Sequence, residues 1–297
     1  MTTVLGWAGA DDDSPLRLAA AVALASAEPL VVASVVPPDP DAPIVSRVDR
    51  EYRAWRDTTV RERQEAAVGA LRSLGVDEVR GTVVRATSEP AGLVDAVRRE
   101  DAGLLVLGAA AAAPTGRFSA GSVAERLLHS SPVPLALAPR DCGPVGPPSR
   151  LTCAWAGTAR SAEALTWTRR LARRWGVPVR LVTFAPERAA MLPSETGLRI
   201  EQTVSEEWAT QAQGRLDDVV GAWEGDPPET VVARGAGWAG ALAAVPWASG
   251  DLLVVGSSRL GPLARVFLGS TASRILRHSP VPVVVVPAGA GGAPTRG

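Results

Sequence analysis

The sequence contains no lysine and no asparagine, and all 31 residues counted as lysine or arginine are arginine. Lysine and asparagine have AT-rich codons, so this bias indicates a GC-rich genome. Without lysine the chain has no side-chain amine for a Schiff base, no lysine nucleophile and no Walker P-loop lysine for phosphate. Three common kinds of enzyme and nucleotide site are therefore excluded.

Cysteine is almost as scarce, with only Cys142 and Cys153. Two cysteines at this spacing match neither a disulfide framework nor a metal-binding pattern. The longest apolar runs, such as 252–256 and 281–287, are far shorter than the roughly 20 residues that a membrane-spanning helix needs, and the start of the chain lacks a signal-peptide pattern. We therefore predict a soluble, cytoplasmic protein without a membrane partner.

Neither sign of charge is in excess, because 31 basic and 31 acidic residues give a formal net charge of zero. Domains that bind nucleic acid through its phosphates carry a basic field on at least one face. The composition therefore predicts no nucleic-acid partner.

The chain repeats itself. Residues 83–139 align without a gap to residues 231–287, and the same register places Trp7-Ala8-Gly9 over Trp155-Ala156-Gly157. A match at both ends of each half indicates two copies of one domain rather than a short-period solenoid. We predict a first domain at 1–140, a Gly/Pro-rich linker at 141–149, a second domain at 150–288 and a disordered tail at 289–297.

Each copy shows apolar runs that alternate with segments of helical spacing. The expected strands are 2–7, 30–36, 79–85, 104–107 and 133–138, then 151–155, 179–184, 229–233, 252–255 and 281–286. The expected helices are 14–27, 46–74, 90–99 and 121–129, then 161–175, 196–223, 239–248 and 270–278. Apolar strands that alternate with helices predict a parallel sheet covered on both faces, with ligands beyond the carboxyl ends of the strands.

A glycine motif follows the expected fourth strand of each copy. In the second copy it consists of Gly256, Ser257 and Arg259, followed by Gly269 and Ser270 at a helix start. In the first copy the corresponding residues are Gly108, Ala111, Gly121 and Ser122. Each helix leads through a Ser-Pro-Val-Pro turn into an apolar strand.

This arrangement resembles the Gly-x2-Gly-x9-Gly-Ser/Thr signature of the universal stress protein (UspA-type) family, and the resemblance covers almost the whole chain as a tandem pair. It implies two Rossmann-like, adenine nucleotide alpha hydrolase-like domains, each with a five-stranded, mainly parallel sheet in the order 3-2-1-4-5. It also implies an internal pseudo-dimer through the fifth strands, Val133 to Ala138 and Val281 to Val286, and leaves open a further homodimer.

The resemblance also implies how a ligand would bind. Glycine after strand four lets the backbone approach a triphosphate, and the Gly-Ser helix start offers N–H groups, a hydroxyl and the positive end of a helix dipole. ATP with Mg²⁺ is the ligand implied. Family members that bind ATP use an aspartate at the end of strand one, where this chain has Ala8 and Ala156. The second motif glycine is replaced by Ala111 and by Arg259, and Arg259 could either clash with a phosphate or bind it.

Other candidate residues have simpler explanations. Because strand side chains alternate, we expect Trp7 and Trp155 to be core residues that point away from a pocket, although either could stack on a flat ligand. His129 and His278 end helices and align with different residue types, so we expect helix C-terminal cations rather than catalytic groups. The acidic run 11–13 is expected to flank a helix start rather than to bind a metal.

The leading functional hypothesis is a non-enzymatic stress-response protein that acts through protein partners, with ATP sites that are weakened or lost. The alternative is an adenine-nucleotide sensor, in which Gly256, Arg259, Gly269 and Ser270 still hold a phosphate. Binding in the first copy would use Gly108, Gly121 and Ser122. An enzyme is the third hypothesis, and it lacks a visible base or nucleophile.

Overall fold

The computed structural model describes residues 2–9, 11–38, 46–142, 146–187, 195–257 and 269–289, with side chains omitted for 195–205. Arg259 and the tail beyond Gly289 lie outside these residues. The chain divides into two compact units, Met1–Pro147 and Pro148–Gly297.

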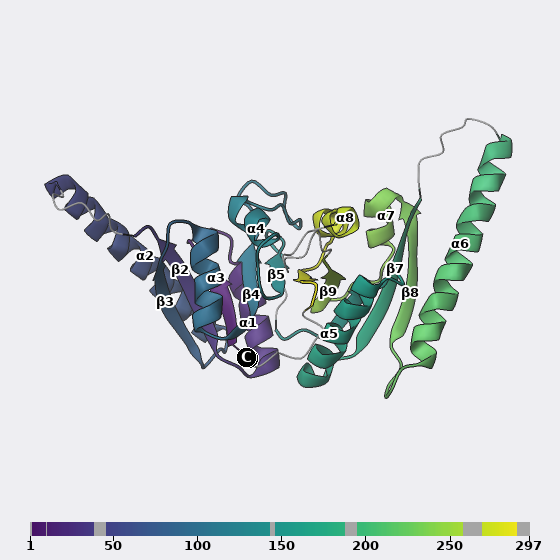
Figure 1. The fold of residues 1–297 in the computed structure, drawn as a ribbon, viewed down its shortest axis with the longest axis horizontal. Coiled ribbons are helices and arrows are strands. Elements are labelled where there is room, and N and C mark those ends of the chain that lie inside the picture. Colours follow the sequence, from purple (N-terminus) through teal and green to yellow (C-terminus); the bar gives the residue numbers. More distant parts are fainter. Residues whose placement is uncertain are drawn as a thin grey trace. The chain divides into compact units, whose positions relative to one another are not determined.

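The first unit is a five-stranded sheet between two layers of helices (Figure 1). Its strands are β1 (Thr2–Gly6), β2 (Leu30–Val36), β3 (Val79–Arg85), β4 (Ala102–Gly108) and β5 (Leu135–Ala138). Its helices are α1 (Ser14–Ser26), α2 (Arg47–Ser73), α3 (Glu89–Arg99) and α4 (Ser122–Leu127). The strands lie in the order β3-β2-β1-β4-β5, and all four neighbouring pairs are parallel.

The second unit repeats this plan. Its strands are β6 (Arg150–Ala154), β7 (Val179–Glu187), β8 (Glu229–Ala236), β9 (Asp251–Gly256) and β10 (Val283–Val286). Its helices are α5 (Ala159–Trp175), α6 (Glu195–Gly221), α7 (Gly237–Ala243) and α8 (Ser270–His278). The order β8-β7-β6-β9-β10 is again parallel throughout. The α/β fold class and the order 3-2-1-4-5 are therefore confirmed in both units.

Both faces of each sheet are covered, which explains why the central strands are apolar throughout. In the first unit α1 packs with α2 while α3 packs with α4, and both α1 and α3 contact β1 and β4. In the second unit α5 lies over β6 and β9, and α7 contacts β7, β8 and α8. A strand such as β4 then has no solvent-facing side, and Leu105 and Val106 are completely buried.

The fifth strands begin two residues later than the sequence indicates, at Leu135 and Val283. Proline at 134 and 282 has no N–H to donate to a neighbouring strand. The residue before each proline is held instead by a serine, because the N–H of Val133 donates to Ser131 Oγ and that of Val281 to Ser279 Oγ, both at 3.3 Å. The Ser-Pro-Val-Pro turn is thus a side-chain-capped entry into the strand.

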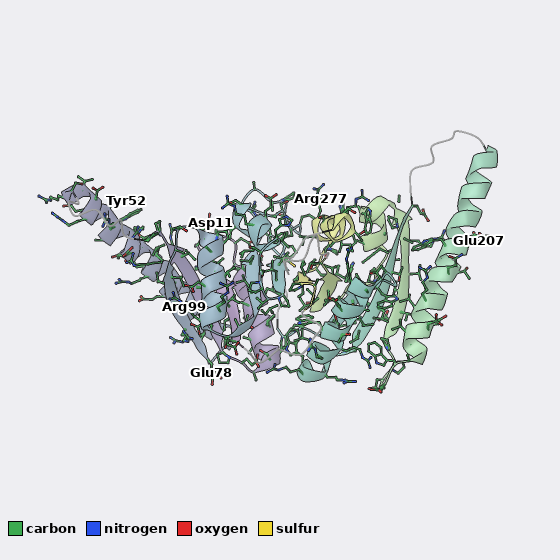
Figure 2. All side chains as sticks on the ribbon, in the orientation of Figure 1. Asp11, Tyr52, Glu78, Arg99, Glu207 and Arg277 are labelled. Atoms are coloured by element: carbon green, nitrogen blue, oxygen red, sulfur yellow. The ribbon has the colours of Figure 1, made fainter. Side chains whose placement is uncertain are left out.

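Helix α2 extends past the sheet that it covers (Figure 1). Its first turns begin at a capping box in which the side chain of Ser46 accepts from the N–H of Asp49 and the carboxylate of Asp49 accepts from Ser46. Tyr52 lies on the projecting part, as Figure 2 shows, and is about three-fifths exposed. Trp55 is exposed to the same degree, with its ring centroid 5.8 Å from that of Tyr52. Among the described helices, none has a stretch of sufficient length and hydropathy to cross a bilayer.

Candidate functional site

Each unit has a cavity at the carboxyl ends of its strands, where a parallel sheet places its ligands. The cavity of the second unit measures about 330 Å³ and lies between the end of β6, the starts of α5 and α8, and side chains from α6 and α7. The cavity of the first unit measures about 640 Å³ and lies at the equivalent place. The two cavities allow the copies to be compared position by position.

The backbone at the end of the first strand of each copy is held in the same way. The N–H of Trp155 donates to Val182 (2.8 Å), and the hydroxyl of Thr183 donates to the carbonyl of Trp155 (2.9 Å). The N–H and carbonyl of Trp7 make the matching bonds, with Ala33 and with the hydroxyl of Ser34, at 2.9 Å each. The loop that follows is thus anchored identically in both copies.

Both tryptophans are among the residues that line the cavities and are partly buried, and the expectation that their side chains point into the core stays a prediction. The strands end one residue before each tryptophan, at Gly6 and Ala154, so the alternation of strand side chains does not fix the direction of the indoles. The indole N–H groups of Trp7 and Trp155 are buried and have no hydrogen-bond partner among the described residues.

Ala8 and Ala156 also line the cavities, and both are exposed. The glycines after them have left-handed backbones, with φ of +82° at Gly9 and +65° at Gly157, which explains why glycine is present in both copies. The methyl groups of the two alanines supply neither charge nor hydrogen bond. The strand-one position of both copies is therefore apolar.

An arginine from the long helix approaches this position in both copies. A Cβ placed on Gly9 would lie 2.6 Å from Cδ of Arg63 in α2, and one placed on Gly157 would lie 3.6 Å from Cδ of Arg215 in α6. Arg63 Nη1 also donates to the carbonyl of Ala8 at 3.4 Å. Sequence reasoning missed both arginines, because no local pattern connects a position deep in a long helix with the end of strand one.

Gly108 and Gly256 line the cavities but also have a packing role. A Cβ on Gly256 would stand 2.7 Å from the carbonyl oxygen of Arg160, and one on Gly108 would stand 2.7 Å from Cγ of Pro15. Each glycine thus lets the start of a helix approach the end of a strand. This contact accounts for glycine at both positions without a ligand.

Two further candidates occupy different places. Ser257 is only 1% exposed and is used by the fold, since its N–H donates to Val286 (2.9 Å) and its hydroxyl accepts from Ala288 (3.2 Å). Ala111 is exposed at the rim of the first cavity, where its carbonyl accepts from Arg140 Nη1 at 2.6 Å. Arg259, the third motif position, lies outside the described residues.

The Gly-Ser helix starts line the cavities in both units, through Gly121 and Ser122 and through Gly269 and Ser270. Neither helix start has a side-chain cap among the described residues. Helix α8 has nine residues and α4 only six, so α8 aligns more peptide dipoles toward its cavity. By contrast, α5 is closed by a capping box between Thr158 and Ser161.

The two cavities differ most in charge. Among the described residues, the second is lined by two arginines, Arg160 and Arg215, and by no carboxylate. The first is lined by Asp11, Asp12 and Glu89 against one arginine, Arg140. Asp12 and Arg160 are equivalent in the alignment that places Trp7 over Trp155. A single aligned position therefore carries opposite charges in the two cavities.

The side chain of Asp12 forms hydrogen bonds within the first unit. Its Oδ1 accepts from the N–H of Ser14 (3.0 Å) and from the N–H of Asp141 (3.3 Å), so the carboxylate caps the start of α1 and attaches the segment after β5. The charged loop is thus a helix flank, and in the described part of the chain no group of three or more potential ligand side chains could hold a metal ion. Neither histidine lines a cavity.

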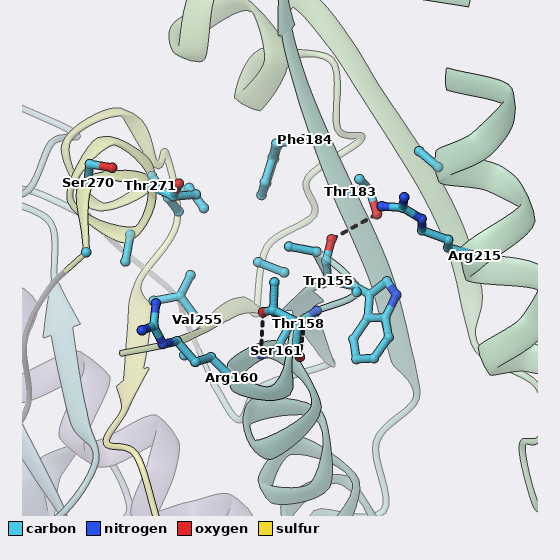
Figure 3. A pocket seen from close by; sticks show the side chains of 18 of the residues that line it. Trp155, Thr158, Arg160, Ser161, Thr183, Phe184, Arg215, Val255, Ser270 and Thr271 are labelled. Carbon is cyan, nitrogen blue, oxygen red and sulfur yellow. Dashed lines mark hydrogen bonds between the residues drawn. The ribbon is translucent and has the colours of Figure 1, made fainter. Parts of the chain in front are cut away.

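The second cavity is also aromatic. Phe184 of β7 and Trp238 of α7 lie with ring centroids 6.4 Å apart and planes tilted by 51°, and both line it. Trp208 of α6 lines it as well and is 43% exposed. Figure 3 shows Phe184 over the cavity, with Ser270, Thr271 and Arg160 on one side and Arg215 on the other.

Comparison with known proteins shows the family to which the chain is similar. A sequence model described as "Universal stress protein family" matches residues 9–139 and 149–287. "Universal stress protein Rv2319c" of Mycobacterium tuberculosis (strain ATCC 25618 / H37Rv) is 40% identical over 293 residues, 97% of this chain and all of the relative. The M. bovis protein "Universal stress protein Mb2346c" matches equally well.

Among solved structures, a universal stress protein from Archaeoglobus fulgidus DSM 4304 has a TM-score of 0.66. It is 19% identical, and the match covers 96% of this chain and 97% of that one. The Pseudomonas aeruginosa PAO1 protein PA1789, described as functionally unknown, has a TM-score of 0.54 at 12% identity, with coverage of 98% and 94%. At these identities the structural matches show the shared fold.

Proposed function

We propose, from the premise that the chain belongs to the universal stress protein family, that it is a tandem regulatory protein of the stress response whose second unit binds an adenine nucleotide. In this proposal the first cavity has lost phosphate binding and the ligand is bound without being chemically changed. The observation that carries the proposal is the contrast in charge between two cavities built on one plan.

The phosphate end of the second cavity is formed by α8 and Arg160. The first turn of α8 offers N–H groups without a side-chain cap, together with the hydroxyls of Ser270 and Thr271. The exposed side chain of Arg160 lines the same cavity. A guanidinium and a helix N-terminus both favour an anion, and their hydrogen bonds to phosphate are charge-assisted.

The remaining wall suits a flat ring. Phe184, Trp208 and Trp238 present aromatic faces, and Trp155 adds an indole whose N–H has no partner among the described residues. A heteroaromatic base is the ligand part that such faces stack on, and stacking on an aromatic side chain contributes about 1–3 kcal/mol per base. Because Ala156 provides no carboxylate, we assign recognition of the base to stacking rather than to an aspartate.

The first cavity has the opposite character. Asp11, Asp12 and Glu89 line it, and Arg140 uses its guanidinium on the carbonyls of Ala111 and Ala113 (2.6 and 3.2 Å). Like charges repel, so these carboxylates disfavour an anionic ligand in the first cavity. In this proposal, the first unit is therefore the one whose nucleotide site is weakened or lost.

We propose that the second unit does not catalyse a reaction of the bound nucleotide. The reason is the lining of its cavity, which includes no aspartate, glutamate, histidine or cysteine among the described residues. A general base or an activated nucleophile needs such a group within hydrogen-bond reach. For the same reason no side chain there offers a carboxylate to Mg²⁺. Any Mg²⁺ would accompany the phosphates of the nucleotide.

Thermal denaturation of the whole chain with and without millimolar Mg-ATP, combined with chromatography of co-purified nucleotide, tests the proposal. Ligand at about 100 times its dissociation constant stabilises the native state by about 2.7 kcal/mol. The matched variants are Gly269→Val and Gly121→Val, both at helix N-caps with ordinary negative φ (−61° and −81°), so valine fits the backbone at each.

We expect Gly269→Val to abolish the ATP-dependent shift, because an isopropyl group blocks the helix start, and Gly121→Val to retain it. A shift abolished by Gly121→Val instead would assign binding to the first unit and overturn the proposal. Release of phosphate or pyrophosphate above a heat-inactivated control would contradict the non-enzymatic role.

A further inference from the structure

The second cavity contains more positive charge than one phosphate site requires. Arg160 comes from the first turn of α5 and Arg215 from α6. In Figure 3 their side chains lie on opposite sides, Arg160 at the lower left beside Val255 and below Ser270 and Thr271, and Arg215 at the right beside Thr183. Within the described part of the chain neither arginine forms an ion pair, and no carboxylate lines the cavity. The two guanidinium groups therefore lie apart and have no counter-ion among the residues that the structure describes.

The arginines near the first cavity are used by the fold, and they are not the aligned counterparts of Arg160 and Arg215, which are Asp12 and Ala67. Arg63 donates to the carbonyl of Ala8, and Arg140 donates to two carbonyls of the loop after β4. The two units thus use arginine differently. In the first unit arginines hold loops in place, and in the second unit they are available at the cavity.

The position of Arg215 is informative. A Cβ on Gly157 would lie 3.6 Å from its Cδ and 3.9 Å from its Nη1, so the side chain passes directly over the loop at the end of strand one. Ala156, also in the cavity lining, leaves that loop without a negative charge. A guanidinium beside an uncharged loop and aromatic rings favours a second anionic group on the ligand.

We propose that the ligand of the second cavity is a nucleotide with anionic groups at two separate positions. One phosphate is bound by the start of α8 with Arg160, and a second, attached elsewhere on the sugar, is bound by Arg215. This inference rests on the proposed function and specifies its ligand class: a nucleoside bisphosphate with its phosphates apart, rather than a di- or triphosphate with its charge at one end.

Titration calorimetry of the full chain at one fixed salt concentration tests this, with adenosine 5′-monophosphate, adenosine 5′-diphosphate and adenosine 3′,5′-bisphosphate as ligands. The two doubly phosphorylated ligands have similar charge and differ in where it lies. We expect the bisphosphate to bind at least about tenfold more tightly than the monophosphate, since one charge-assisted bond is worth that factor. Adenosine 5′-diphosphate should exceed the affinity of the monophosphate by a smaller factor.

The variants are Arg215→Met, Arg160→Met and, as the matched control from the first unit, Arg63→Met. Arg215→Met should remove the advantage of the bisphosphate and leave monophosphate affinity unchanged, whereas Arg160→Met should weaken all three ligands. Arg63→Met should change none of them. Arg215 is exposed, so its replacement is expected to leave the unliganded melting temperature unaltered.

Equal affinity for the two doubly phosphorylated ligands, or equal loss of both in Arg215→Met, would show general electrostatic attraction and overturn this inference while the proposed function stands. No binding of any of the three ligands would overturn both.

Discussion

The α-carbon of Gly256 lies against the backbone of Arg160: a Cβ at Gly256 would be 2.7 Å from the carbonyl oxygen of Arg160 and 3.3 Å from its carbonyl carbon. The end of β9 and the start of α5 are therefore in direct backbone contact. Because Arg160 follows the first residue of α5, this contact also positions its side chain at the cavity.

Gly256→Ala is expected to destabilise the second unit by about 1–3 kcal/mol, the usual cost of forcing an extra methyl into a packed contact. Backbone atoms cannot move aside as a flexible side chain can. Urea denaturation monitored by tryptophan fluorescence measures the effect. The control is Gly214→Ala in α6, where the Cβ would meet nothing within 4 Å and alanine should stabilise the helix by about 0.5–1 kcal/mol. Equal stability of Gly256→Ala and wild type would contradict the packing role.

Arg160→Asp gives the second cavity the residue that the first has at the aligned position. We expect nucleotide affinity to fall by about tenfold or more, because a charge-assisted bond is replaced by repulsion. The unliganded protein should keep its melting temperature, since the side chain is exposed and an aspartate is favourable in the first turn of a helix. Calorimetry checks this, with Arg61→Asp on the exposed part of α2 as a control of equal charge change. Equal losses in the two variants would show that overall charge, not the cavity, sets affinity.

The second unit contains a buried ion-pair network at the opposite ends of its strands. Asp251 is 1% exposed and accepts from Arg150 Nε and Nη2 and from the N–H of Ala248, each at 2.9 Å. Arg180, also 1% exposed, lies with Nη1 3.5 Å from Asp251 and donates through Nε to Glu229 at 3.0 Å. Since Asp251 contacts both arginines, its removal leaves buried positive charge.

Asp251→Asn is therefore expected to destabilise the second unit by about 3–5 kcal/mol. The control is Glu100→Gln in the first unit, which breaks a pair with Arg80, whose side chain is 57% exposed, and should cost less than about 1 kcal/mol. Chemical denaturation of both variants gives the comparison. Similar costs would mean that the network is more hydrated than its burial indicates.

Cys153 is expected to make the free energy of unfolding depend on pH in the alkaline range. Complete burial raises the pKa of its thiol from 9.0 to about 12, against a smaller opposing effect of a hydrogen bond with Thr168. Above about pH 9 the unfolded chain releases a proton that the folded chain keeps. The free energy of unfolding should then fall with rising pH by about 1.4 kcal/mol per unit, up to the folded pKa.

This slope is open to measurement because the chain has no lysine and a single tyrosine to titrate in the same range. Urea denaturation between about pH 8 and 10.5 measures it. Cys153→Ala should flatten the slope, and Cys142→Ala, the matched control, should leave the contribution of Cys153 in place. An unchanged slope in Cys153→Ala would assign the pH dependence to another group.

Much of the fold was predictable, because its signals are local or repeated. Apolar strands alternating with amphipathic helices predicted the parallel sheets, and the repeated Gly-Ser helix start with its Pro-Val-Pro strand identified the family. The ends of the elements were less predictable. Helix α7 ends at Ala243, ahead of Pro246, and β10 begins only after Pro282, since each end depends on which N–H groups find a partner.

For the candidate site, the sequence by itself determined what the motif positions lack. The alanines at 8 and 156 remove a carboxylate in any fold, because no neighbour can restore a charge to a methyl group. It also determined that Gly269 and Ser270 start a helix beyond a strand end, since the local pattern is sufficient for that.

Only the tertiary structure determined which charged side chains line each cavity and which glycines are required by a packing contact. Arg215 stands beside Gly157 because α6 crosses β7 and β8 on its way past the end of β6, and that contact joins residues far apart in the chain. Gly256 and Arg160 are likewise far apart in the chain and come into contact because the end of β9 lies against the start of α5. Electrostatic and steric effects depend on distance in space, whereas a sequence motif records only distance along the chain.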